Sequence, residues 1–244
     1  MIKEFKGELQ AKALAESLGL FITKYKGVYL VSNNREELLA NYNLAYYSKE
    51  GIFYDREIFE EDGFTYLVIH NKDIVDASLI ELPYGLKSCA TMFSGCTSLK
   101  VPPTIPVGTK DCSYMFESCT SLVVPPEIPK GVIDCNFMFM NCVSLKVPPN
   151  IPEGVTTCKS MLKGCISLAT APILPNSIEA CVSMFNGCTS LEKPPKIPDN
   201  ADYCLSMFQG CSSLKELPHF PENCDTTGAL WCTPFKEFDY DKEI

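Results

Sequence analysis

The sequence predicts an α+β fold in which a solenoid of stacked repeats follows a small N-terminal domain. From residue 89 onward, one 23-residue unit recurs in the order Cys-x-x-Met-Phe-x-x-Cys-x-Ser-Leu-x-x-Pro-Pro-x-Ile-Pro. Residues 1–75 lack this unit and alternate helix-like with strand-like segments. We therefore divide the 244-residue chain into an N-terminal domain over 1–75, a solenoid over 76–235 and a polar tail over 236–244.

The N-terminal segment reads as a small α+β unit. Helix formers with apolar residues at helical spacing cover 8–18, and Asn34 can cap a second helix over 35–40. Four segments have the composition of strands, and the first two of them flank a Lys-Gly turn: 21–25, 28–31, 51–54 and 64–70. The unit either caps the apolar face of the first repeat or forms a separate recognition domain. The need to cover an open solenoid end favours the cap.

The repeat keeps its phase over six full units, with partial units at both ends. One unit cannot bury its own apolar side, so neighbouring units stack and share a core. The residue types that recur in phase, namely Cys, Met, Phe, Leu and Ile, are those expected inside. The Met-Phe-x-x-Cys segment predicts a short helical or 3₁₀ turn on the convex side. The Leu-x-x-Pro-Pro-x-Ile-Pro segment predicts an extended, interrupted stretch opposite it, because proline removes backbone donors.

These residues resemble the BspA-like (Treponema-type) leucine-rich repeats of bacteria, their phages and some protists. Cys96-Thr97-Ser98-Leu99 through Ile105-Pro106 and on to Met115-Phe116 follows the order of that family's unit. The Pro-Pro variant with Cys-x-x-Met-Phe is similar to a subgroup in gut bacterial and phage proteins. The resemblance covers about residues 76–235 and implies a leucine-rich-repeat scaffold. The family's better-known members are surface or secreted proteins with export signals.

The repeat pattern becomes irregular at both ends of the array, as expected for the capping units of a solenoid. The segment 80–85 matches 103–108 one period later and is a half unit. At the far end Cys224 and Cys232 leave the register. We interpret residues 215–235, which include the single Trp231, as a degenerate cap.

Fourteen cysteines admit three explanations. Zinc binding fails, because pairs seven apart in units 23 apart lack the spacing of structural zinc sites. Disulfides between stacked coils are within geometric range. Columns of inward-pointing cysteines are better explained as free thiols that fill a narrow core. Cys224 and Cys232 are the expected exceptions.

Composition and motifs argue against several function classes. A formal net charge of −9 disfavours nucleic acid as a partner, since counterion release needs a basic surface. His70 and His219 are the only histidines, and His219 occupies a variable position of the repeat. No glycine-rich phosphate loop is present, the acidic run over 57–62 is expected to be solvated, and no apolar run is long enough for a membrane span. We therefore predict no enzyme, no cofactor and no metal site.

The function prediction depends on positions that vary while the scaffold repeats. Two columns lie at alternate positions of the extended side and are expected to point outward, and a third follows the Met-Phe pair. Side chains of different chemistry at regularly spaced positions favour protein recognition. Solvent-exposed positions that contact no partner would, however, vary in the same way. Val123, Phe137, Met140 and Ile173 are apolar and are the first candidates for a contact. The candidate partner-binding residues are Lys100, Thr104, Val123, Glu127, Phe137, Met140, Lys146, Asn150, Ile173, Glu192, Lys196, Lys215 and His219.

We expect a non-catalytic protein–protein interaction module. Its first form is a cytoplasmic binder or inhibitor, of a kind that phages encode, which masks a host protein. The N-terminal residues contain no apolar core of signal-peptide length, and the core is rich in thiols, which favours the cytoplasm. The alternative is a surface or virion attachment module, an adhesin that recognises a cell-surface protein or glycan after removal of a leader. The repeat predicts no particular oligomeric state.

Overall fold

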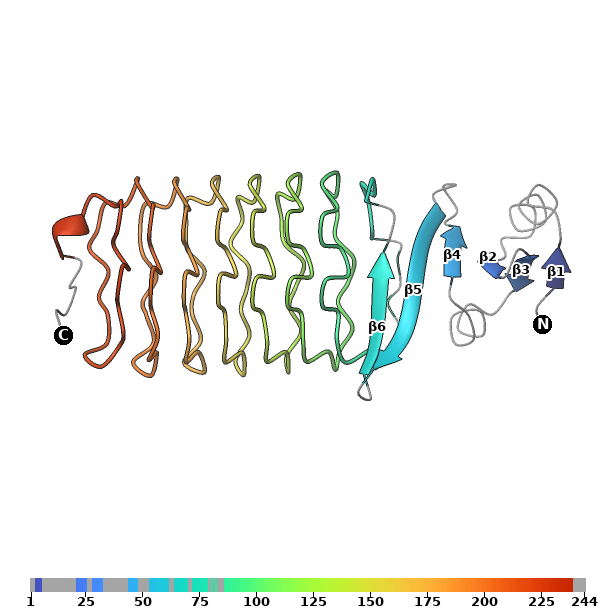
Figure 1. Cartoon of the computed structure of the whole chain (residues 1–244), viewed down its shortest axis with the longest axis horizontal. Coiled ribbons are helices and arrows are strands. Elements are labelled where there is room, and N and C mark those ends of the chain that lie inside the picture. Colours follow the sequence, from blue (N-terminus) through green and yellow to red (C-terminus); the bar gives the residue numbers. More distant parts are fainter. Residues whose placement is uncertain are drawn as a thin grey trace.

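The computed structural model describes the solenoid and the strands of the N-terminal segment. Figure 1 shows the coils stacked along the long axis, with the N-terminal strands beyond one end and the chain's C-terminus at the other. Because successive coils lie side by side, each coil contacts mainly its two neighbours. The described residues are 3–5, 21–25, 28–32, 44–47, 53–61, 64–69, 72–78, 80, 82 and 86–238.

The N-terminal strands form one six-stranded antiparallel sheet in the order β1-β3-β2-β4-β5-β6. The predicted hairpin is present, with Tyr25 of β2 opposite Val28 of β3 across the Lys-Gly turn. The strand bounds are β1 Lys3–Phe5, β2 Phe21–Tyr25, β3 Val28–Ser32, β4 Leu44–Tyr47, β5 Phe53–Glu61 and β6 Phe64–Ile69.

Two strands were not predicted, and one is longer than predicted. The sequence predicted no strand at β1 or at β4. β5 overlaps the strand predicted over 51–54 and continues into the acidic run. That run pairs with β6 through Glu57, Glu60 and Glu61, so strand pairing overrides the turn-like composition. The predicted helix over 8–18 and the one after Asn34 lie outside the described residues.

The segment between the two cysteines of a coil is a run of three overlapping tight turns, and the predicted helical or 3₁₀ turn is wrong. In the first full coil, Met92 N–H donates to Cys89 O at 3.3 Å, Ser94 N–H to Thr91 O at 3.0 Å and Cys96 N–H to Phe93 O at 3.0 Å. The third residue of the first and of the last turn has a positive φ, 58° at Thr91 and 74° at Gly95, as type II turns require. A 3₁₀ helix has negative φ throughout, so it cannot form here.

The turns leave alternate N–H groups pointing to the next coil. In the first full coil four of them donate to carbonyls of the next: Cys89 N to Asp111 O, Thr91 N to Ser113 O, Phe93 N to Met115 O and Gly95 N to Glu117 O, at 2.8–2.9 Å. Later coils repeat the pattern, and isolated parallel bridges join equivalent residues beside it, as at Ser88↔Asp111 and Asp111↔Asp134. The turn segments therefore form a continuous inter-coil ladder.

The extended segment is interrupted as the prolines predict. Among the solenoid residues that the structure describes, its ladder contains only two isolated bridges, Asp76↔Val101 and Thr170↔Lys193. The second lies where Ala171 replaces the first proline of the pair. Alanine keeps the backbone N–H that proline lacks, which allows the bridge.

The core is a set of in-phase columns, as the repeat predicts. Both cysteine columns and the Met, Phe, Leu and Ile columns are buried, most of them completely. Rings of the phenylalanine column stack from coil to coil, with centroids 5.7 Å apart for Phe93–Phe116 and for Phe116–Phe139. Leu162 takes the place of the aromatic ring in the coil that follows Phe139. From Cys119 onward, the second cysteine of each full coil adds a hydrogen bond, as Cys142 Sγ does to Phe116 O at 3.0 Å.

The last coil is one residue shorter than the others. Bridges along the turn side link residues 23 apart, whereas the final one links Tyr203 to Asp225. Thr233 takes the place of the second cysteine, since its N–H donates to Leu230 O as Cys211 N–H donates to Phe208 O. A short 3₁₀ helix, η1 (Lys236–Phe238), follows. The sequence predicted the broken register of this coil.

Candidate functional site

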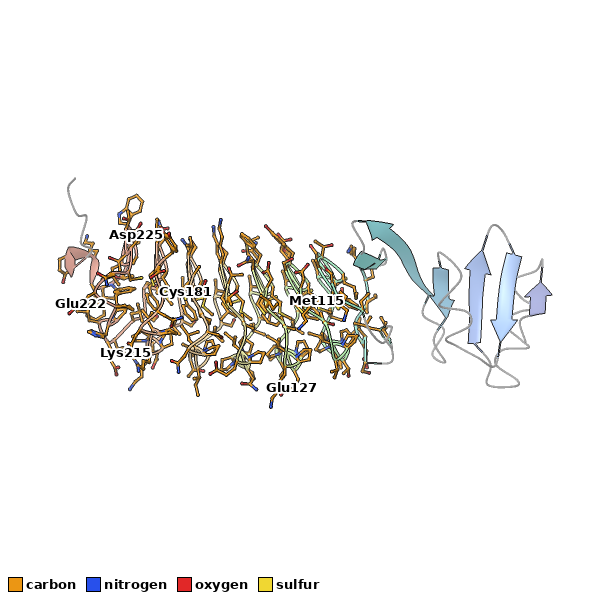
Figure 2. The ribbon with its side chains drawn as sticks, turned by 90° about the horizontal axis from the view of Figure 1, so that it is seen from below. Met115, Glu127, Cys181, Lys215, Glu222 and Asp225 are labelled. Carbon is orange, nitrogen blue, oxygen red and sulfur yellow. The ribbon has the colours of Figure 1, made fainter. Side chains whose placement is uncertain are left out.

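The outer surface of the extended segments is the principal candidate site, and we call it the proline face. It comprises residues 100–104 of the first full coil and their equivalents at 23-residue steps. Figure 2 shows Glu127 and Lys215, which belong to this face, on one long edge of the solenoid and Asp225 of the turn-side bridges on the other. A partner that contacts the proline face therefore does not need to contact the turn segments.

The predicted outward columns do point outward. Every candidate of the extended segments is exposed: Lys100, Thr104, Val123, Glu127, Lys146, Asn150, Ile173, Glu192, Lys196, Lys215 and His219. Ile173 is the extreme case, because 90% of its surface is accessible although it is aliphatic. An exposed aliphatic side chain on an ordered lattice is the kind of group that a partner can cover.

Phe137 and Met140 do not join Val123 and Ile173 in one patch. They lie in the turn segment of their coil and are only partly exposed. The Phe137 ring stacks on Tyr114 with centroids 4.4 Å apart, and Lys159 Nζ lies 5.9 Å from its centroid. Phe137 has a positive φ of 58°, and this stack offsets part of the conformational cost. Its aromatic character thus has a structural role within the turns.

The structure adds an apolar column that the sequence analysis missed. Val101, Val124 and Val147 have 42%, 51% and 44% of their surface exposed. Simple alternation along a strand would turn both these valines and the second proline of each pair inward, but the prolines interrupt the strand, and in these coils only the second proline is buried. The available signal was the recurring Val-Pro-Pro tripeptide, in which the valine precedes a segment that cannot pair regularly.

The C-terminal half of the proline face is charged. Lys193 Nζ lies 2.9 Å from Glu216 Oε1, and Lys215 Nζ lies 2.8 Å from Glu192 Oε2. The bond to Glu216 raises the pKa of Lys193. Both pairs are well exposed, so solvent screens them and they add little stability. Their main effect is to neutralise the four charges against one another.

A groove of about 780 Å³ lies on the proline face and reaches the ion-paired residues Glu192 and Lys193. Three successive coils line it, over 150–153, 169–176 and 192–198. Its lining is rich in proline and includes Ala171 and Ile173. At the position of Ala171, four of the other five full coils carry proline. The missing ring leaves room in this coil, and Ile173 stands beside it.

No catalytic arrangement emerges from the described residues. His219 is exposed on the proline face, and His70 lies outside the described residues. Within the described part, no three His, Cys, Asp or Glu side chains are grouped to hold a metal ion. The same part contains no helix with the length and apolar composition needed to cross a membrane.

The cysteines are thiols throughout. Burial raises the pKa of Cys142 and of Cys211 to about 12, and the other cysteines of both columns shift in the same direction. A thiol with such a pKa carries almost no thiolate near neutral pH and is a poor nucleophile. Of the two predicted exceptions, Cys232 is exposed, whereas Cys224 is buried at the edge of the core.

The comparisons with known proteins identify the fold. No protein-family model and no curated protein matches the chain. Among solved structures, a leucine-rich repeat protein of T. pallidum matches with a TM-score of 0.54 and 23% identity, over 69% of this chain and 80% of that one. A leucine-rich repeat protein of Bacteroides ovatus matches with a TM-score of 0.47 and 22% identity, over 73% of this chain and 55% of that one. Together with the stacked coils, the first match establishes that the array has a leucine-rich-repeat fold.

Proposed function

We propose that this chain is a non-catalytic protein-interaction module that binds its partner through the proline face. The observation that carries the proposal is Ile173, an aliphatic side chain left 90% exposed beside a groove on an otherwise close-packed scaffold. Exposed apolar groups that border a concavity are typical of recognition surfaces. The constant core holds the varied outer columns at fixed spacing, which suits one extended contact surface.

The finer form of the proposal is a cytoplasmic binder that masks a host protein. Buried thiols rather than disulfides fill its core, and this kind of core suits a reducing compartment. Masking requires only tight occupancy of a partner surface, so no reactive group is needed. An origin in a phage is consistent with such a role and is part of the same proposal.

A paired capture experiment tests this function. Tagged protein is used as bait in host-cell lysate and, in parallel, on intact cells, and bound proteins are identified by mass spectrometry. The variant Val123→Asp/Ile173→Asp charges the proline face at two exposed aliphatic positions. The control Ile166→Asp places the same charge on an aliphatic side chain outside this face that is 46% exposed.

The expected result is one lysate protein that the control retains and the double variant loses. Equal capture by both variants would contradict the assignment of the proline face. Binding to intact cells without a lysate partner would contradict masking and establish the attachment alternative.

A further inference from the structure

We propose that the groove beside Ile173 binds an extended segment of the partner through one aromatic side chain. That side chain is flanked by an acidic residue facing Lys196 and a basic residue facing Glu153. The inference rests on the proposed function and adds the chemistry of the partner. It comes from the lining, the size and the unpaired charges of the groove.

The lining selects for apolar contact. Pro172, Pro175, Pro194 and Pro195 are among the residues around the groove, and proline offers no N–H to a ligand. These prolines and Ile173 offer a ligand contact area rather than donors, and aromatic rings bury the largest area of any side chain, while Asn150, Thr170 and Asn176 supply polar side chains elsewhere in the lining. Proline and aromatic rings pair in the recognition of proline-rich peptides, and here the proline belongs to the receptor.

The size of the groove fits a peptide segment. Its volume of about 780 Å³ spans three coils, which is more room than one side chain fills. Two of the three coils are joined at the groove, because Glu192 N–H donates to Ala169 O at 3.2 Å and Thr170 forms a bridge with Lys193, so the lining is an ordered surface.

The charges around the groove give the guest a pattern. Lys193 and Glu192 are neutralised by their ion pairs, so they offer little to a ligand. Lys196 and Glu153 have no ion pair in the part of the chain that the structure describes. They come from the coils on either side of Ile173, so the lining presents opposite charges across the aliphatic side chain.

The coil spacing sets a lower bound on the distance between the two guest charges. Hydrogen-bonded neighbours lie about 4.8 Å apart, so two coils separate the opposite charges by at least roughly 10 Å, and Glu153 also lies three residues beyond Asn150, the equivalent of Lys196. An extended chain advances about 3.3 Å per residue, which places the guest's acidic and basic residues at least three positions apart. The aromatic residue lies between them.

A displayed peptide library tests the inference without knowledge of the natural partner. The probe is a random 12-residue library on yeast, sorted against the full-length protein labelled with a fluorophore. We expect enrichment of peptides with Trp, Tyr or Phe between an acidic and a basic residue. The best peptide, made synthetically, should then bind the protein in solution by fluorescence anisotropy.

Variants of the groove have matched controls in the repeat itself. Ile173→Asp and Ala171→Pro should each weaken the peptide at least tenfold, the latter because it restores the ring that most other coils carry. Thr104→Asp changes the equivalent of Ile173 three coils away and should leave binding within twofold. Lys196→Glu should reverse the preference for an acidic residue, with Glu127→Lys in the same column as its control.

The outcomes separate this inference from the proposed function. No enrichment, enrichment without aromatic residues, or a peptide indifferent to Ile173→Asp and Lys196→Glu would overturn the groove assignment. If a lysate partner is still lost with Val123→Asp/Ile173→Asp but kept with Ala171→Pro and Lys196→Glu, the proline face binds and the groove does not. Circular dichroism of each variant shows whether the coils remain folded, and Lys196→Glu, at an exposed position, tests the inference even if Ala171→Pro unfolds.

Discussion

From the second full coil onward, the second cysteine of each full coil fills space in the core and donates a hydrogen bond to a buried carbonyl. Its thiol donates to the carbonyl of the preceding coil, as Cys119 does to Phe93 O at 3.2 Å and Cys165 does to Phe139 O at 3.2 Å. Those carbonyls also accept a turn hydrogen bond from within their own coil. Cysteine combines small apolar volume with a weak donor, which alanine and valine cannot do. The in-phase recurrence of this residue therefore has a local chemical reason.

Serine substitutions distinguish the two cysteine columns. Cys142→Ser keeps a donor for Phe116 O, whereas the Cys135 thiol has no hydrogen-bond partner among the described residues, so Cys135→Ser places a hydroxyl there without one. An unsatisfied buried hydroxyl costs about 1–3 kcal/mol, so we expect Cys135→Ser to lower the free energy of unfolding more than Cys142→Ser. Urea denaturation followed by circular dichroism measures both values. Equal losses would show that the Sγ–carbonyl contact is not a hydrogen bond.

The buried thiols also predict a labelling pattern. Burial raises the pKa of Cys142 and Cys181 to about 12, so these groups stay protonated below that pH and react slowly with alkylating agents. Cys232 is exposed. At pH 8, native protein treated with iodoacetamide should gain one adduct, located at Cys232 by peptide mass spectrometry, and denatured protein should gain many. Rapid modification of the column cysteines in native protein would contradict their burial.

At the scale of elements, the type II turns decide how the coils join. A positive φ at the third residue of each turn rotates the peptide so that alternate N–H groups point to the next coil. Glycine adopts this φ without strain, as at Gly187, while asparagine adopts it at the equivalent Asn141. Thr91 and Tyr114 adopt it in the other turn despite their side chains. The ladder therefore stabilises conformations that these residues disfavour in isolation.

Substitutions at one turn glycine test this account. Gly187 has a φ of 76°, and a Cβ added there would be in ordinary contact with Gly164 at 3.8 Å, so the cost is conformational rather than steric. We expect Gly187→Ala to lower stability by about 1 kcal/mol and Gly187→Asn to lower it less, because asparagine tolerates left-handed backbone. Thermal unfolding of both variants provides the comparison. A larger loss with asparagine would show that side-chain packing, not backbone conformation, limits the position.

The sequence predicts the period and the core columns because both follow from residue type at fixed spacing. It does not predict the turns, since Thr91 and Tyr114 carry no glycine signal for a positive φ. It also does not identify Val101 as exposed, because two prolines break the alternation that assigns strand residues to faces. The groove depends on a ring that Ala171 lacks, and the sequence shows the substitution without showing the space.

At the scale of the whole molecule, the array behaves as a one-dimensional stack. Each coil obtains its hydrogen bonds and its apolar contacts from the coils beside it, so internal coils have two partners and the last has one. In the last coil Thr233 stands in place of the second cysteine and Leu230 in place of the phenylalanine. The C-terminal end should therefore open first.

Amide exchange along the stack measures this gradient. Gly187 N–H donates to Gln209 O at 2.7 Å, and the equivalent Gly210 N–H donates to Trp231 O at 2.8 Å. We expect Gly210 to exchange at least tenfold faster than Gly187 despite the similar bond, because only the terminal coil must open. Hydrogen–deuterium exchange by mass spectrometry resolves the two. Equal protection of the Gly187 and Gly210 amides would indicate that the terminal coil opens only when the entire array unfolds.

The inter-coil ladder has one further consequence. Every coil presents the same donors to its successor and the same acceptors to its predecessor, at an almost constant step of 23 residues. A duplicated or deleted unit would meet matching groups on both sides, so the gene can change the length of the protein in whole coils without redesign of a junction. The distance between two contact points on the scaffold can therefore change only in steps of one coil.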